Sequence, residues 1–291
     1  MANKYDRKYF LTVGQLGQSG FEISDLDIDF TIKKTIKNDK KLNSMQIKII
    51  NLDTENRDIL SSKKNLVLIF KAGYKDDVTT IFEGKITKSS SKHTGIEYET
   101  NIEAVEGFLA ARDSKVSKSF PAGTNALKIV NFLCSEFLKS ENEISMGSIY
   151  NSEILSSKIY RNGYSCCGLV RSELANILAS VNMCFSIENN LLFVSANEKA
   201  TQMQGILLDY SSGLITAEKT KNDPVVLKEE KKPVDGVNFE AFLTGGIKIL
   251  SMIKIDNEKD IKAAFKVVEV EHKGIYLSGD WITKGFCVEV S

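Results

Sequence analysis

Apolar and polar residues alternate along much of the first third of the chain. In one stretch Leu26, Ile28, Phe30 and Ile32 alternate with Asp25, Asp27, Asp29 and Lys33. Successive side chains of a strand point to opposite faces, so this alternation predicts a strand with one buried and one solvated face. Similar patterns recur up to about residue 105, where they predict roughly six strands arranged as a barrel or a sandwich.

One predicted hairpin, formed by 65–74 and 79–86, is apolar on both faces of its first strand. Leu66, Leu68, Phe70 and Tyr74 point to one face, and Val67 and Ile69 point to the other. An antiparallel hairpin at the surface of a monomer normally has one solvated face. We therefore expect the second face to be covered, either by another layer of this chain or by a neighbouring subunit.

After about residue 120 the spacing of apolar residues becomes that of helices. Thr124 is expected to cap the first of two helices, and Gly168 to begin the second. The segment 140–157 between them is polar and is predicted to be irregular. Asn189 and Asn190 separate two short apolar runs and predict a hairpin turn, because asparagine tolerates positive φ.

The last third returns to β patterning. Residues 246–250, 265–272 and 281–290 alternate well and are predicted to be strands. The polar stretch 220–238, which contains the charged run Lys228–Lys232, is predicted to be a solvated loop or ribbon. The chain is therefore predicted to be an α+β protein, mostly β, with three parts: 1–115, a small α+β unit at 116–202, and 203–291.

Composition and charge limit the classes of function. Thirty-eight basic residues balance 38 acidic ones among 291, so no basic field would attract a nucleic-acid backbone. A net charge near zero suits a protein that ends up in an assembly. The sequence shows no secretory signal and no run of about 18 apolar residues, so we expect folding in the cytoplasm and no membrane-spanning segment. The five cysteines form no CxxC pair and are expected to be free thiols.

Candidate chemical groups are few. His93 lies in a Ser/Lys-rich segment and is expected at the surface, and His272 is expected in a turn or at a strand end rather than in catalysis. Asp25, Asp27 and Asp29 would lie about 7 Å apart on a strand, too far apart to converge on one Ca²⁺. No nucleophile elbow or phosphate-binding loop is present. The sequence thus predicts no catalytic residue, metal site or cofactor.

Several short segments, taken in order, resemble one protein family. The first are Phe30–Thr35 (FTIKKT), Met45–Leu52 (MQIKIINL), Ala72–Tyr74 (AGY) and Ile81–Ile86 (IFEGKI). Later ones are 160–163, 184–192, 213–216, 265–272 and 279–283. Their order and spacing over nearly the whole chain are similar to those of baseplate hub proteins of contractile-tailed phages and phage-tail-like particles. The compact final part and Lys228–Lys232 depart from that pattern.

The resemblance implies a structural protein, not an enzyme, that needs no cofactor. Such hubs are homotrimers in the tail baseplate, where they join the sixfold tail tube to the threefold central spike and line the channel. Two β-barrel tube-type domains, here 1–115 and 203–291, would flank the small α+β unit, so that three chains supply six barrels. The partners would be the tube, the spike and other baseplate proteins. The second face of the hairpin would lie at the trimer seam, with Val67, Ile69, Tyr74 and Phe82 as interface residues.

Two alternatives stay open. Related hubs occur in phage-tail-like bacteriocins and other contractile injection systems, and the residues do not distinguish these from an infectious phage. A more distant alternative is a cell-wall-degrading tail protein, which would need paired carboxylates about 5–9.5 Å apart in a cleft. We find no dedicated lytic domain in the sequence.

Overall fold

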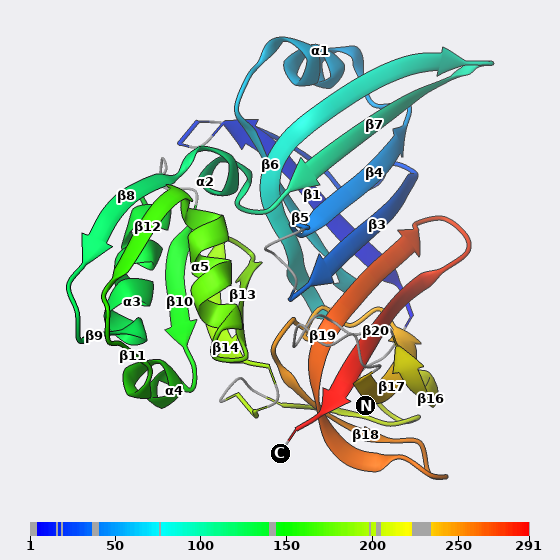
Figure 1. Cartoon of the computed structure of the whole chain (residues 1–291). Coiled ribbons are helices and arrows are strands. Elements are labelled where there is room, and N and C mark those ends of the chain that lie inside the picture. Colours follow the sequence, from blue (N-terminus) through cyan, green and yellow to red (C-terminus); the bar gives the residue numbers. More distant parts are fainter. Residues whose placement is uncertain are drawn as a thin grey trace.

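The computed structural model describes residues 5–290 apart from 16, 19, 37–40, 76, 140–143, 198, 202–204 and 223–233. The predicted turn Asn38–Lys40 and the charged run Lys228–Lys232 lie outside the described residues. One large sheet, mostly antiparallel, stands beside a smaller unit of helices and short strands (Figure 1). The predicted class, α+β and mostly β, is confirmed.

The first third forms strands and one short helix. Its elements are β1 (Arg7–Gln15), β2 (Phe21–Ile23), β3 (Ile28–Thr35), β4 (Ser44–Ile50), α1 (Thr54–Ser62), β5 (Leu66–Tyr74), β6 (Asp77–Thr94) and β7 (Glu97–Val105). The predicted hairpin is present as β5 and β6, which pair antiparallel with a bulge after Phe70. Asp53 caps α1, because its carboxylate accepts from the Asn56 N–H at 2.9 Å. The strand predicted from residue 25 begins later, so Asp25 and Asp27 lie in the loop before β3.

The middle third is the α+β unit. Its elements are α2 (Phe108–Asp113), β8 (Lys115–Phe120), β9 (Thr124–Asn125), α3 (Ala126–Phe137), β10 (Ser145–Ile149), α4 (Ser152–Ser157), β11 (Ile159–Tyr160), β12 (Tyr164–Leu169), α5 (Val170–Ala179), β13 (Met183–Glu188) and β14 (Leu191–Ala196). The predicted turn between β13 and β14 is confirmed, with φ of 49° at Asn189 and 60° at Asn190. Gly168 lies at the end of β12, two residues before α5 begins.

Two predictions for the middle third were wrong. Asn125 rather than Thr124 caps α3: the Asn125 side chain accepts from the Lys128 N–H at 3.0 Å, whereas the Thr124 hydroxyl donates to the Pro121 carbonyl. The segment 140–157, predicted to be irregular, contains β10 and α4. β10 exists because it pairs in parallel with β14, a tertiary contact that the local polar sequence does not reveal.

The last third is again β. Its elements are β15 (Ile206–Leu208), β16 (Leu214–Asn222), β17 (Val234–Phe242), β18 (Met252–Asp256), β19 (Lys262–Ile275) and β20 (Trp281–Glu289). Strands predicted at 265–272 and 281–290 are confirmed as β19 and β20. The strand predicted at 246–250 is wrong, because this segment is a buried turn in which Leu250 has φ of 67°. The described residues of 220–238 belong to the antiparallel β16–β17 ribbon.

A single 13-stranded sheet joins the first and last thirds. Its main path is β16-β17-β20-β19-β3-β4-β7-β6-β5-β1-β2, and β18 and β15 branch from β19. To close a separate barrel from the first third, the second edge of β3 would have to return to β1 or β2. In the described residues that edge pairs with β19 instead. The predicted pair of barrel domains is therefore not confirmed; the sheet is continuous and no closed barrel is found among the described strands.

Three apolar clusters fill the interior. One lies under the strands of the first third, one inside the middle unit, and one under the strands of the last third. The outer two exchange residues, since Leu243 and Trp281 pack in the first cluster and Ile36 packs in the last. The Trp281 indole N–H also donates to the Gly73 carbonyl at 3.2 Å. The first and last thirds thus share packing as well as a sheet, and the boundaries at 115 and 202 stay predictions.

Candidate functional site

The four residues predicted at a subunit interface fall into two groups. Val67 and Ile69 lie on the outer face of β5 and are half-buried. Tyr74 and Phe82 are 4% and 0% exposed and belong to the first apolar cluster. The Tyr74 hydroxyl donates to the Trp281 carbonyl at 3.2 Å. Tyr74 and Phe82 are enclosed by their own chain, whereas Val67 and Ile69 are partly exposed, and the interface role of all four residues stays a prediction.

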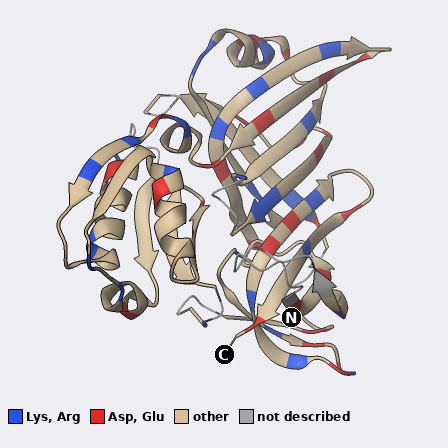
Figure 2. Ribbon diagram, in the orientation of Figure 1, with Lys and Arg blue, Asp and Glu red and all other residues tan. Residues whose placement is uncertain are grey.

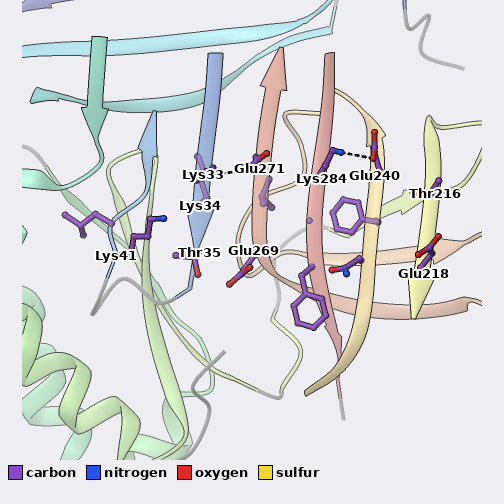
Figure 3. Close-up of a pocket in the computed structure, with 16 residues that line it drawn as sticks. Lys33, Lys34, Thr35, Lys41, Thr216, Glu218, Glu240, Glu269, Glu271 and Lys284 are labelled. Carbon is purple, nitrogen blue, oxygen red and sulfur yellow. Dashed lines mark ion pairs between the residues drawn. The ribbon is translucent and has the colours of Figure 1, made fainter. Parts of the chain in front are cut away.

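A groove of about 690 Å³ crosses the solvent face of the large sheet where the first and last thirds meet (Figure 3). Neighbouring strands β3, β19, β20 and β17 carry one row of side chains of alternating charge: Lys33, Glu271, Lys284 and Glu240. The Lys33 Nζ lies 3.3 Å from Glu271 Oε2. The Lys284 Nζ lies 3.0 Å from Glu240 Oε2. The ion pair between Lys33 and Glu271 therefore joins the first third of the chain to the last third.

Paired charges continue over the other strands of this face. Asp29 and Lys48 approach to 3.9 Å, and Lys88 and Glu103 to 3.6 Å. Basic and acidic residues are interspersed along the strands of the large sheet (Figure 2). Exposed ion pairs contribute only about 0–1 kcal/mol each to stability. This face is exposed to solvent and carries both signs of charge. Its described residues therefore form no field of a single sign that would attract a nucleic acid.

On the opposite face of β3, Lys34 joins the sheet to the middle unit. Its side chain is only 2% exposed. The Lys34 Nζ lies 3.2 Å from Glu106 Oε1, contacts Glu188 Oε1, and donates to Asn189 Oδ1 at 3.3 Å. Asn43 donates to Glu106 Oε2 at 2.9 Å and to a carbonyl of β13. We call these five residues the Lys34 cluster; in it one ammonium serves two buried carboxylates.

Burial and charge set protonation in and around the Lys34 cluster. Desolvation raises the pKa of Glu106 to about 7, although the nearby Lys34 ammonium acts to lower it. The pKa of Lys34 is raised, because the two carboxylates outweigh the lowering effect of desolvation. His272, on β19, was expected in a turn or at a strand end, but it is buried within the strand. Desolvation and the Lys34 charge lower its pKa to about 3, so its ring is neutral, with Nδ1 2.9 Å from Thr283 Oγ1.

A second buried lysine joins the last third to the middle unit. Lys266, on β19, is 0% exposed. Its Nζ donates to Ser195 Oγ at 2.8 Å, to the Ala196 carbonyl, and to the Lys199 carbonyl at 3.4 Å. Among the described residues no carboxylate pairs with it, and desolvation lowers the pKa of its ammonium to about 8.

The neighbouring polar groups described above are buried. Glu106 and Glu188 are neighbouring carboxylates, but at 0% and 4% exposure they are closed to a glycan. Lys266 and Ser195 are an amine–hydroxyl pair that is equally enclosed. His93 is exposed, as predicted, and all five cysteines are free thiols.

Within the part of the chain that the structure describes, no group of His, Cys, Asp and Glu could hold a metal ion. In the same part no helix is long and apolar enough to cross a membrane.

No prediction of burial was made from the sequence for Lys34 or Lys266. Lys34 follows Phe30 and Ile32 at an inward position of the alternating pattern, so its burial was visible in the spacing. Lys266 stands between Phe265 and Val267, where the period of two gives no clear inward face, because β19 has a bulge there.

Neither a protein-family model nor a curated protein sequence matches the chain. Several solved structures, however, have a similar fold. The 43 kDa tail protein of prophage MuSo2 from Shewanella oneidensis matches with a TM-score of 0.64 and 7% identity, over 98% of each chain. A tail protein from Neisseria meningitidis MC58 matches with a TM-score of 0.65 and 11% identity, over 98% of this chain and 97% of that one.

A third similar structure comes from a secretion machine. The E. coli c3393 protein, a component of the type VI secretion system with structural similarity to the T4 bacteriophage tail proteins gp27 and gp5, has a TM-score of 0.63 and 10% identity. The match covers 96% of this chain and 77% of that one. At such low identities the similarity concerns the fold. In its fold, therefore, the chain is similar to phage tail proteins, as the resemblance in the sequence predicted.

Proposed function

We propose that the chain is a structural protein of a contractile tail, namely its baseplate hub. In this role three copies form a ring that joins the sixfold tail tube to the threefold spike and lines the channel. The observation that carries the proposal is the match over 97–98% of the length of two tail proteins. That match includes all three parts of this chain and the way they are arranged. The protein would be made in the host cytoplasm and reside in the tail baseplate.

The shared sheet supports this role. Three chains can present six similar positions to a sixfold tube only if the first and last thirds of each chain keep a fixed relative orientation. The β3–β19 pairing and the exchange of core residues such as Trp281 provide that rigidity. In the proposed ring Val67 and Ile69 meet the next subunit. Complete burial of a Val or Ile side chain is worth about 1.5–3 kcal/mol, so covering this half-exposed pair would favour assembly.

Assembly tests the proposal directly. The wild-type chain, alone or mixed with the tube and spike proteins of the same tail, should show a native mass of three copies. The double variant Val67→Asp/Ile69→Asp should lose the trimer while keeping its circular dichroism spectrum. Ile96→Asp is the matched control, because Ile96 is 95% exposed and should tolerate the charge. A monodisperse monomer at micromolar concentration that binds neither partner would count decisively against the hub.

A phage-tail-like bacteriocin or another contractile injection system is the second candidate. The similarity to the E. coli type VI secretion component favours it specifically. The chemistry of the chain would be the same in either machine, so the genomic neighbourhood is the discriminating observation. Capsid and terminase genes beside the gene would indicate a phage, and their absence from a complete tail cluster would indicate the other machines.

A cell-wall-degrading protein is the most distant candidate. Its acid and base would have to reach a glycan, but Glu106 and Glu188, the paired carboxylates described above, are enclosed. We therefore propose that the chain has no enzymatic activity. Purified protein should leave the turbidity of a bacterial cell-wall suspension unchanged, and clearing that survives repurification would contradict this.

A further inference from the structure

The Lys34 cluster holds more negative than positive charge. Lys34 lies between Glu106 and Glu188, and it is the basic group that both carboxylates contact. In the described residues Glu188 Oε2 is buried and accepts no hydrogen bond, and Glu106 Oε1 has only its ion pair with Lys34. A buried acceptor without a donor is destabilising, and more so when the group is charged. A proton on either carboxyl would remove the surplus charge and supply a donor.

Among the residues that the structure describes, Lys34 is the one cation that forms an ion pair with Glu106 or Glu188. On β19 the facing group is His272, which is neutral. Asn43, Asn189 and Asn190, from the loop before β4 and the β13–β14 turn, are uncharged. Other charged residues line the groove on the solvent side, namely Lys33, Lys41, Glu269 and Glu271. Lys85 of β6, which is buried, lies opposite Val105, the residue before Glu106.

The same cluster is the polar contact between two parts of the molecule. Lys34 belongs to β3 of the large sheet, Asn43 immediately precedes β4, and Glu106 follows β7 directly. Glu188 ends β13 and Asn189 begins the β13–β14 turn of the middle unit. The Asn189 side chain also donates to the Thr80 carbonyl of β6 at 3.4 Å. Any change in the charge of the cluster therefore acts on the contact between the sheet and the middle unit.

We propose that the Lys34 cluster is a proton-binding latch. With one carboxyl protonated it holds the β13–β14 turn against the sheet, and with both carboxyls ionised it releases the turn. The latch works within one chain and does not depend on the proposed role in a tail.

The pKa of Glu106, raised by burial to about 7, places this change near neutrality. A carboxyl whose pKa is higher in the folded state binds its proton more tightly there than in the unfolded chain. Its stabilising effect is complete below the ordinary pKa and is lost as the pH rises through the folded value. The latch should therefore be closed in mild acid and loosened above about pH 7.

Hydrogen exchange of the full chain, followed by mass spectrometry between about pH 5.5 and 8.5, tests the latch. Protection factors, corrected for the intrinsic rate at each pH, are compared for peptides of β13, β14 and their turn. In the wild type we expect protection to fall roughly tenfold across this range. Glu106→Gln, which keeps the size and cannot ionise, should give a flat profile. Glu103→Gln is the matched control, an exposed carboxylate on β7 that should leave the wild-type profile unchanged.

Glu188→Gln provides a second variant in case Glu106→Gln does not fold. It also leaves one carboxylate for one lysine, so a flat profile is again expected. Peptides of α3 serve as the internal reference because α3 lies outside the cluster. The proposal is overturned by a flat wild-type profile, by a wild-type profile that both glutamine variants retain, or by equal loss of protection in α3.

Discussion

Two buried lysines attach the large sheet to the middle unit, and their surroundings differ. Lys34 contacts two carboxylates, whereas Lys266 contacts a hydroxyl and backbone carbonyls. Burial acts on both ammonium groups in the same direction, yet the pKa of Lys34 is raised and that of Lys266 is lowered to about 8. Burial alone therefore does not decide the charge of a lysine; the charge of its partners does.

The two contacts also differ in which group carries the unbalanced charge. Around Lys34 the surplus is negative, and loss of the lysine would leave two carboxylates without a cation. Around Lys266 the surplus among the described residues is positive, and loss of the lysine would remove that charge and leave neutral acceptors. Removing one partner of a buried ion pair is much more destabilising than removing an isolated buried charge, because an uncompensated charge stays behind.

The largest expected effect is that of Lys34→Met at neutral pH. We expect the free energy of unfolding, measured by urea denaturation, to fall by about 3–5 kcal/mol. Lys33→Met is the control, since Lys33 is the next residue on the same strand and its side chain is 55% exposed. That control should change stability by less than about 0.5 kcal/mol. Similar losses in the two variants would refute the importance of the buried charge.

Lys266→Met should be less harmful than Lys34→Met. It leaves the Ser195 hydroxyl and the Ala196 and Lys199 carbonyls without their donor, but it removes an ammonium that is expensive to bury. We expect a loss of about 1–3 kcal/mol in the same urea experiment. A greater loss than that of Lys34→Met would invert the comparison between the two contacts.

The pH dependence of stability should separate the two lysine contacts in sign. The folded pKa of Lys266 is lowered from 10.5 to about 8, so its contribution is present above the unfolded value and is lost as the pH falls toward 8. Between these values the wild type should gain up to about 3 kcal/mol relative to Lys266→Met. Glu106 acts in the opposite direction: its contribution is lost as the pH rises from 4.5 to about 7.

Subtracting the variant's free energy of unfolding from that of the wild type at each pH isolates one contact from the other groups that titrate. Wild type minus Lys266→Met should rise in the alkaline range, and wild type minus Glu106→Gln should fall in the acid-to-neutral range. Two difference profiles with slopes of the same sign would show that at least one of the two pKa shifts is assigned to the wrong contact.

Local patterns predicted the strands better than they predicted how the strands are joined. The β5–β6 hairpin and the Asn189–Asn190 turn followed from alternation and turn chemistry, which are local. Pairing of β3 with β19 joins residues more than 200 positions apart, and nothing in either strand marks it. No position was predicted for Lys34, although the spacing from Phe30 to Lys34 places it inward. A charged residue at an inward position of an alternating strand is a signal for a buried ion cluster.

The smallest expected effect is the coupling energy of the exposed ion pair between Lys33 and Glu271, whose charged atoms are almost as close as those of Lys34 and Glu106. Lys33 and Glu271 approach to 3.3 Å on the solvent face, and Lys34 and Glu106 approach to 3.2 Å in the interior. If distance decided the strength, the two pairs would be equal. Water and salt screen the exposed pair, so a double-mutant cycle with Lys33→Met and Glu271→Gln should give a coupling energy below about 1 kcal/mol that shrinks in high salt.

The matching cycle with Lys34→Met and Glu106→Gln should give a coupling several times larger that salt barely changes, because mobile ions do not reach a side chain that is 2% exposed. Equal couplings in the two cycles would mean that the interior of the Lys34 cluster is wetter than its burial implies. The proton latch would then lose its physical basis, since a carboxyl that water can solvate has no reason to hold a proton at neutral pH.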